Sequence, residues 1–177
     1  DLLQSLFARH GDCPLPIIAA HSPSDCFECS MEAARIALTY MTPVIFLSDL
    51  YVANGAEPWK IPNVSKLPEI KTQFAQDPDD FVVYRRNSET LARTQAIPGQ
   101  AGFEHRIGGL EKSEDGSVSY DPENHEQMTH LRMEKINGIA KTYDPIEVQG
   151  DDEGDLLVIG WGGTYGAISS ATKVLQN

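Results

Sequence analysis

The sequence predicts an α/β fold with a small parallel sheet, a long irregular connecting arm and the first βα unit of a second folded body. Two short apolar runs separated by a segment of ordinary helix length predict the sheet. Proline and glycine recur between residues 50 and 110 without hydrophobic periodicity, which predicts the arm. A glycine-rich stretch between an apolar run and a helical pattern predicts the last unit.

The first sixty residues predict a helix followed by a βαβ unit. Residues 1–9 place leucine and phenylalanine on one helical stripe, and Gly11 follows as a stop. Residues 15–20 and 44–47 are apolar runs of the kind found as buried strands in parallel sheets. We therefore expect these two runs to pair in parallel.

The segment between the two strands predicts a helix with clear boundary signals. Ser22 is the expected N-cap, Pro23 the first helical residue, and Asp25 the partner that completes a capping box. Thr42 precedes Pro43, and a residue in that position is disfavoured in the α region, so the helix should end there.

The rest of the chain predicts two more helices and one more strand. Residues 50–110 should be largely irregular, because they lack periodicity and are rich in proline and glycine. Asp121 and Pro122 predict the start of a helix near residues 122–143. An acidic joint at residues 151–155 should precede a strand at 155–160, a glycine-rich turn at 160–166 and a helix at 167–175.

Composition excludes several classes of protein. The chain has 177 residues with 14 basic and 26 acidic side chains, a net charge of −12, which argues against a nucleic-acid partner. The apolar runs are too short to cross a membrane. Three cysteines and no secretion leader favour the cytoplasm. Because the sequence opens on Asp1 without methionine and already in a helical pattern, we expect an internal fragment of a longer chain.

Two pairs of residues have spacings close to those of metal or redox motifs, but neither pair is strong evidence for such a site. Cys26 and Cys29 have the spacing of a dithiol pair, but two helical cysteines without a redox task are the favoured interpretation. His125 and His130 lie one residue further apart than the two ligands of a zinc-protease helix, so they point in different directions. We therefore expect no metal site.

Polar residues near the predicted strands are candidates for a ligand pocket. His10 and Asp12 lie between the first helix and the first strand, and Asp49 follows the second strand, where α/β folds place ligands. We list these three as near-pocket candidates for acid–base work, with loop-capping roles as the alternative.

The glycine-rich turn is the second candidate site. It departs from the dinucleotide fingerprint, so tight packing is the favoured interpretation, and an anion or interface site remains open at four residues, namely Gly160, Gly162, Gly163 and Thr164. Glu104, His105 and Arg106 form a polar cluster in the arm that we interpret as solvated or interface residues.

The sequence resembles one family from end to end and in order. The chain is similar to the alpha subunit of 2-oxoacid:ferredoxin oxidoreductases, especially those acting on 2-oxoglutarate. The likeness is carried by residues 1–12, 22–27, 42–49, 53–62, 104–109, 121–126 and 160–166.

The resemblance implies the domain order and the reaction. Residues 1–55 would end a pyrimidine-side thiamine-binding domain, residues 56–153 would connect, and residues 154–177 would begin a transketolase C-terminal-like domain. A beta subunit would supply an iron–sulfur cluster and the magnesium and diphosphate side of the shared thiamine pyrophosphate. Together the subunits would convert 2-oxoglutarate and coenzyme A to succinyl-coenzyme A and carbon dioxide, with electrons passing to ferredoxin.

The resemblance also implies what this chain lacks. In the family, a Pro-Ile-Thr-Pro-type loop and the glutamate that activates the aminopyrimidine ring precede the position of Asp1. No catalytic residue of the family can therefore be carried onto this sequence, and we expect it to bind no cofactor and to be inactive alone. The choice among 2-oxoglutarate, pyruvate and branched 2-oxoacids is open. The rival hypotheses are a non-catalytic α/β interaction module and a dinucleotide-binding protein.

Overall fold

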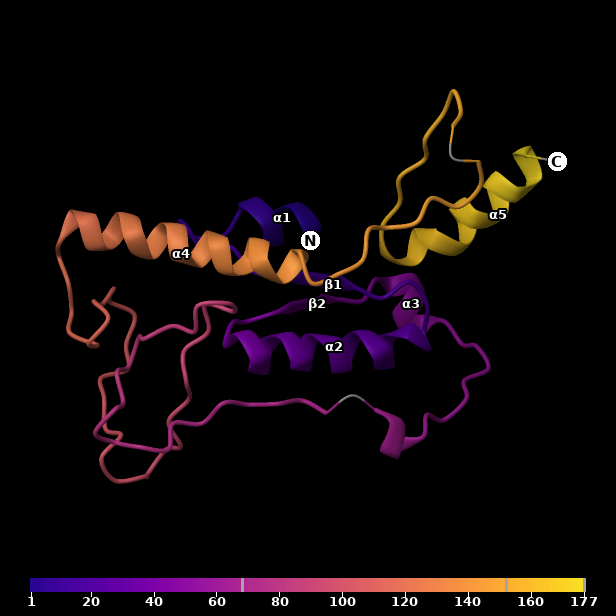
Figure 1. Ribbon diagram of the computed structural model, residues 1–177. Helices are drawn as coiled ribbons and strands as arrows, with labels where there is room; N and C mark the ends of the chain where they lie inside the picture. Colours follow the sequence, from indigo (N-terminus) through magenta and orange to yellow (C-terminus); the bar gives the residue numbers. More distant parts are fainter. Residues whose placement is uncertain (68, 152, 177) are drawn as a thin grey trace.

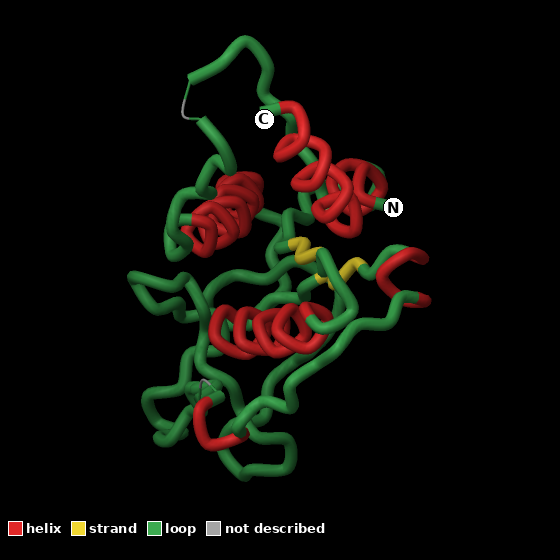
Figure 2. Tube along the Cα trace, turned by 90° about the vertical axis from the view of Figure 1, so that its right-hand side faces the viewer, coloured by secondary structure: helices red, strands yellow, loops and turns green. Residues whose placement is uncertain are grey.

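The computed structural model describes residues 1–67, 69–151 and 153–176. In the view of Figure 1, the two-stranded sheet lies between α2 (Asp25–Tyr40) below and α1 (Leu2–Phe7) and α4 (Pro122–Ala140) above. Figure 2 shows the same layers from the side. The helices are α1 (Leu2–Phe7), α2 (Asp25–Tyr40), α3 (Leu50–Asn54), α4 (Pro122–Ala140) and α5 (Tyr165–Leu175).

The sheet confirms the predicted βαβ unit. Strands β1 (Ile17–Ala19) and β2 (Ile45–Leu47) pair in parallel, with Ile17 opposite Ile45 and Ala19 opposite Leu47. Helix α2 connects them. Each strand is three residues long and only half-buried, so the strands are shorter and less covered than the sequence predicts.

The start of α2 differs from the predicted capping box. The helix begins at Asp25, and Ser24 is its N-cap without a side-chain bond. The Ser22 hydroxyl still accepts from the Asp25 N–H, at 3.4 Å, but the Asp25 carboxylate accepts from the backbone N–H of His21 at 3.0 Å rather than from that of Ser22. The prediction of Ser22 and Pro23 as the cap and first residue is therefore wrong, because His21 captures the carboxylate.

The hydrophobic core joins α4 to the βαβ unit. Ile36 and Tyr40 of α2 pack with Ile139 of α4, and these three side chains are 1–7% exposed. Partly buried side chains from strand β1, from the residue before β2 and from α4 complete the cluster: Ile18, Val44 and Ile136. A helix more than 80 residues further along the chain thus covers the face that α2 leaves open.

Helix α4 confirms the predicted start and corrects the predicted end. The Asp121 carboxylate accepts from the Glu123 N–H at 3.0 Å, which caps the helix as expected. The helix ends at Ala140, not near residue 143, because the Thr142 N–H and hydroxyl both donate to the Ile139 carbonyl and close a tighter turn. The Tyr143 hydroxyl then donates to Glu32 of α2.

The arm is mostly irregular, as predicted, and Figure 2 draws it almost entirely as loop. Its regular parts are α3, which the sequence analysis missed, and a 3-10 turn at Val64–Lys66. Isolated bridges such as Phe74 with Gln95 and Arg86 with Arg93 hold the loops together.

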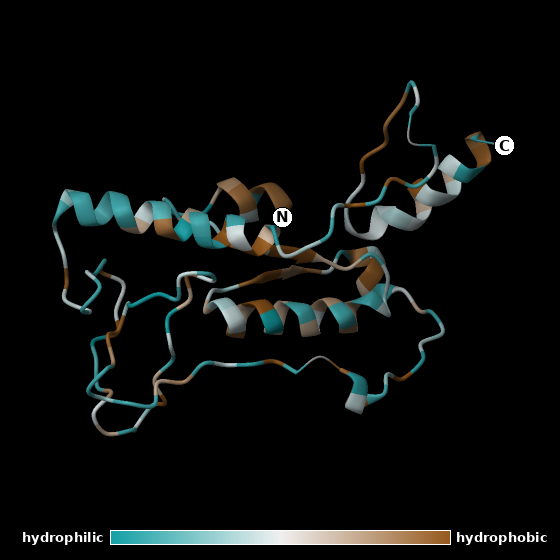
Figure 3. Cartoon of the chain, viewed as in Figure 1, coloured by the Kyte–Doolittle hydropathy of each residue, from teal (hydrophilic) through white to brown (hydrophobic). Residues whose placement is uncertain are grey.

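The end of the chain lacks the predicted strand. Residues 155–160 are extended without strand pairing, since they meet no neighbouring strand in the described part of the chain. Leu156 and Ile159 are 79% and 84% exposed, and Figure 3 shows this apolar run away from the core. The predicted βα unit is therefore a 3-10 turn (Gly162–Thr164) followed by α5, which begins two residues before the predicted helix.

Two further expectations concern the acidic joint and membrane-spanning helices. The acidic joint at residues 151–155 includes Asp152, which lies outside the described residues. Among the helices that the structure describes, none is both long enough and apolar enough to cross a membrane.

Candidate functional site

Polar residues from four parts of the chain meet where β1 and β2 end. His21 lies two residues after β1, and Asp49 lies two residues after β2. The carboxyl ends of parallel strands are the usual place for ligands in α/β folds. We call this group the carboxyl-edge cluster; it consists of His21, Ser22, Asp25, Asp49, Glu57, Gly163 and Tyr165.

Asp49 connects two candidates that the sequence analysis treated separately. Its carboxylate caps α3 by accepting from the Val52 N–H at 2.8 Å, and it also accepts from the Gly163 N–H at 2.9 Å. The bond from Val52, with the bond from Gly163, holds the pKa of Asp49 below its ordinary value, although partial desolvation opposes it. The near-pocket candidate and the glycine-rich turn therefore lie side by side.

The contact explains why residue 163 is glycine. A Cβ atom at this position would stand 2.3 Å from Asp49 Oδ2, so any other residue would push the carboxylate away. The Gly163 amide, where an anion could bind, is already taken by a carboxylate of the same chain. A dinucleotide pyrophosphate would need such amides, and this arrangement disfavours that rival hypothesis.

The remaining turn residues shape the entry to α5. Gly162 has a φ of +57°, a conformation that glycine adopts readily. The Thr164 hydroxyl accepts from the Trp161 N–H at 3.0 Å and donates to the Trp161 carbonyl at 2.7 Å. A Cβ atom at Gly160 would collide with Ile168 at 2.2 Å. An external anion at these residues stays a prediction.

His21 and Asp25 form a hydrogen-bonded pair that can move a proton. His21 Nδ1 lies 2.6 Å from Asp25 Oδ2, and the imidazole ring meets the Tyr165 ring edge-on with centroids 4.8 Å apart. Burial raises the pKa of Asp25, but hydrogen bonds from the His21 backbone and ring outweigh it, so the pKa lies below its ordinary value. An ionised carboxylate at Nδ1 orients the imidazole and leaves Nε2 for exchange with a ligand.

Glu57 ties the arm to the loop that follows β1. Its Oε1 accepts from the Ser22 hydroxyl at 2.7 Å and from the Ser24 N–H at 2.5 Å. Hydrogen bonds from Ser24 and Ser22 lower the pKa of Glu57 to about 2. Together with Asp25 and Asp49, it gives the carboxyl-edge cluster a negative charge.

The two cysteines of α2 do not have the chemistry of a redox pair. Both are free thiols. Burial, with a hydrogen bond to the Asp25 carboxylate, raises the pKa of Cys29 to about 12, whereas dithiol chemistry needs a lowered pKa. This supports the non-redox interpretation.

His10 and Asp12 lie apart from the cluster. Both are exposed and precede β1, so they stand at the opposite end of the strand from His21 and Asp49. The geometry brings together only one of the three near-pocket candidates, Asp49, with the glycine-rich turn. A pocket role for His10 and Asp12 stays a prediction that no contact supports.

The other histidines pair with separate carboxylates. His125 Nδ1 meets Glu111, while His130 Nε2 lies 3.8 Å from Glu126. Within residues 1–67, 69–151 and 153–176, no three His, Cys, Asp or Glu side chains are grouped to hold a metal ion. In the arm, His105 Nδ1 lies 2.8 Å from the Phe103 carbonyl.

Sequence reasoning missed His21, and a signal for it was available. The argument that singled out Asp49, its place just beyond a buried strand, applies equally to His21 after the first strand. Asp25, four residues later, was assigned to helix capping, whereas its carboxylate serves the histidine.

Comparisons with known proteins give a consistent picture. Residues 1–121 match the family described as pyruvate flavodoxin/ferredoxin oxidoreductase, thiamine diphosphate-binding. The chain is 52% identical over 176 residues to the 2-oxoglutarate oxidoreductase subunit KorA of Mycobacterium tuberculosis, covering 98% of this chain and 26% of that protein. It is 30% identical over 168 residues to the 2-oxoacid:ferredoxin oxidoreductase 1 alpha subunit of Aeropyrum pernix, covering 92% and 26%.

A solved structure matches the fold over nearly the whole chain. The 2-oxoglutarate:ferredoxin oxidoreductase of Magnetococcus marinus, solved with 2-oxoglutarate, coenzyme A and succinyl-CoA bound, superposes with a TM-score of 0.87 at 29% identity. The match covers 99% of this chain and 31% of that chain. The two curated relatives named above are likewise about four times as long as their matched region, since the match covers 26% of each.

Proposed function

The chain belongs to the pyruvate flavodoxin/ferredoxin oxidoreductase family through its thiamine diphosphate-binding domain, and on that premise we propose that it is part of the alpha subunit of a 2-oxoglutarate:ferredoxin oxidoreductase. The observation that carries the proposal is the 52% identity over 98% of the chain to a 2-oxoglutarate oxidoreductase subunit. The match to a structure with 2-oxoglutarate and coenzyme A bound supports the same substrates.

The proposed reaction is an oxidative decarboxylation. 2-Oxoglutarate, coenzyme A and two oxidised ferredoxins give succinyl-coenzyme A, carbon dioxide, a proton and two reduced ferredoxins. Bound thiamine pyrophosphate supplies the nucleophilic carbon and electron sink that such chemistry needs.

The carboxyl-edge cluster does not fit the diphosphate part of that cofactor. Asp25, Asp49 and Glu57 have lowered pKa values and are therefore ionised at neutral pH, and three carboxylates repel a diphosphate. We accordingly infer that a beta subunit holds the diphosphate and its magnesium ion, and the family resemblance implies an iron–sulfur cluster on the same subunit. We assign this part of the alpha subunit a scaffolding and subunit-interface role.

The domain division follows from this proposal. Residues 1–55 would close the pyrimidine-side domain, residues 56–153 would connect, and residues 154–177 would begin the transketolase C-terminal-like domain. The exposed apolar run at residues 156–159 supports a further body that covers it. Three free cysteines support a reducing compartment, the cytoplasm.

The test uses the natural full-length polypeptide that carries this sequence, co-expressed with its beta subunit. We expect coenzyme A-dependent reduction of ferredoxin with 2-oxoglutarate, and succinyl-coenzyme A identified by mass spectrometry. Parallel assays with pyruvate and a branched 2-oxoacid rank the substrates. Absence of turnover with every 2-oxoacid by a thiamine-loaded complex would refute the proposal, whereas faster turnover of pyruvate would correct the substrate alone.

A further inference from the structure

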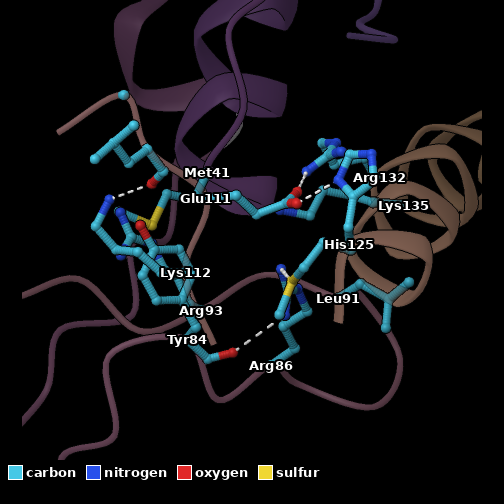
Figure 4. Close-up of a pocket in the computed structure, with 13 residues that line it drawn as sticks. Met41, Tyr84, Arg86, Leu91, Arg93, Glu111, Lys112, His125, Arg132 and Lys135 are labelled. Atoms are coloured by element: carbon cyan, nitrogen blue, oxygen red, sulfur yellow. Dashed lines mark hydrogen bonds and ion pairs between the residues drawn. The ribbon is translucent and has the colours of Figure 1, made fainter. Parts of the chain in front are cut away.

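A basic pocket lies at the end of α2 that points away from the carboxyl-edge cluster. Its volume is about 530 Å³, within the range of small-molecule sites. Figure 4 shows side chains from the arm and from α4 converging on it, with Met41 beyond the end of α2 on one side. Five basic residues line it together with a single acidic one: Arg86, Arg93, Lys112, Arg132 and Lys135, with Glu111.

The acidic residue of the pocket already has two partners within the chain. Glu111 Oε1 accepts from Arg132 Nη1 at 2.7 Å, and its other oxygen meets His125. The Lys112 ammonium is also satisfied, since it donates to the carbonyls of Gly108 at 2.9 Å and Leu110 at 2.6 Å and so fixes one wall. Three cations, Arg86, Arg93 and Lys135, are left.

These three cations have no ion-pair partner in the part of the chain that the structure describes. Arg86 donates only to weak or long acceptors, the Met128 sulfur at 3.2 Å and the Tyr84 carbonyl at 3.4 Å. Glu114 attracts Arg86 through space but forms no ion pair with it. A protein with a net charge of −12 therefore gathers more positive than negative charge around this pocket.

The surrounding structure holds the cations in position. Arg86 and Arg93 sit opposite each other in an antiparallel bridge, and the Arg93 guanidinium lies over the Tyr84 ring, 4.5 Å from its centre. Burial, together with repulsion from Arg86 and Arg93, lowers the pKa of Lys135 to about 8. Burial and neighbouring positive charge disfavour the charged form of Lys135, and an anion bound among these cations would relieve that repulsion.

We propose that the pocket formed by Arg86, Arg93, Lys135 and their neighbours binds a small phosphorylated anion. A carboxylate carries one charge, whereas a phosphate monoester carries nearly two at neutral pH, and a diphosphate carries more. Guanidinium groups also match phosphate oxygens in a forked, two-bond geometry. The proposal rests on this pocket alone and not on the proposed reaction.

The test is a labelling experiment on the full-length polypeptide in complex with its partner subunit. Acetylation of Lys135 at pH 8 is followed by mass spectrometry with and without inorganic diphosphate, ADP or succinate. We expect diphosphate to slow Lys135 acetylation at least fivefold and to leave Lys141, an exposed lysine outside the pocket, unaffected. Because this measurement uses the natural protein, it does not depend on whether a variant folds.

Variants then identify the groups that bind. Arg93→Gln should raise the diphosphate concentration needed for half-protection at least tenfold. The matched control is Arg85→Gln, which removes the same charge from an exposed arginine paired with Asp80, and it should leave that concentration unchanged.

Each outcome decides the proposal. Equal protection by diphosphate and ADP would assign recognition to the phosphates, and protection by ADP alone would identify a nucleotide as the source; both support the proposal. Protection by succinate equal to that by diphosphate would overturn it in favour of a dicarboxylate site. No protection by any probe, or an Arg93→Gln variant indistinguishable from Arg85→Gln, would also overturn it.

Discussion

Replacing Ile139 with alanine should detach α4 from the sheet layer. Ile139 is 3% exposed and packs on Ile36 and Tyr40 of α2. Truncating a buried isoleucine to alanine costs about 2–5 kcal/mol, because apolar contacts are lost and a cavity remains. The site cannot refill easily, since its neighbours come from strand β1, from the residue before β2 and from two helices that are themselves packed together.

Native-state hydrogen exchange measures this cost locally. If α4 opens as a unit, a loss of about 2 kcal/mol accelerates exchange of its protected amides more than about 20-fold. Ile146→Ala is the matched control, since Ile146 is 97% exposed and its truncation should change exchange less than about twofold. Exchange in α4 of Ile139→Ala within twofold of the unmodified protein would show that the helix is held by something other than this cluster.

Three further results are expected, two at the carboxyl-edge cluster and one at the cysteines. Asp49→Ala should accelerate exchange at α3 and at the Gly163 amide together, because one carboxylate serves both, and a change at only one of them would contradict the shared role. Hydrogen bonds from Ser24 and Ser22 lower the pKa of Glu57 to about 2, so its contribution to stability is present above its ordinary pKa of 4.5 and is lost as pH falls toward 2. Glu57→Gln should therefore make the thermal midpoint depend less on pH over that range. Iodoacetamide at pH 8.5 should alkylate exposed Cys13 well before Cys29, whose pKa of about 12 keeps it protonated, and equal rates in peptide mass spectra would refute this.

Local signals in the sequence predicted the elements that local interactions define. Asp121 followed by Pro122 gave a correct helix start, because the cap and the first helical residue are adjacent in the chain. The two apolar runs predicted the parallel pair, since a helix of ordinary length between them leaves few other topologies.

Elements that depend on distant partners could not be predicted in this way. Residues 155–160 have the composition of a strand but meet no partner strand among the described residues. The contact of Asp49 with Gly163 joins residues 114 positions apart, and no sequence motif predicts it. The basic pocket draws on α4 and two separate stretches of the arm, so charge counts along the sequence, which show acid in excess at residues 111–155, conceal it.

The bond between Asp49 and Gly163 has a consequence for the order of events during synthesis. The βαβ unit has left the ribosome once Leu47 has emerged, yet the carboxyl edge of its sheet stays unfinished until more than a hundred further residues have been translated. Until then the Asp49 carboxylate can cap α3 alone. Domains generally fold as units during synthesis; here this edge of the sheet acquires its final shape only after a segment more than a hundred residues downstream has been made.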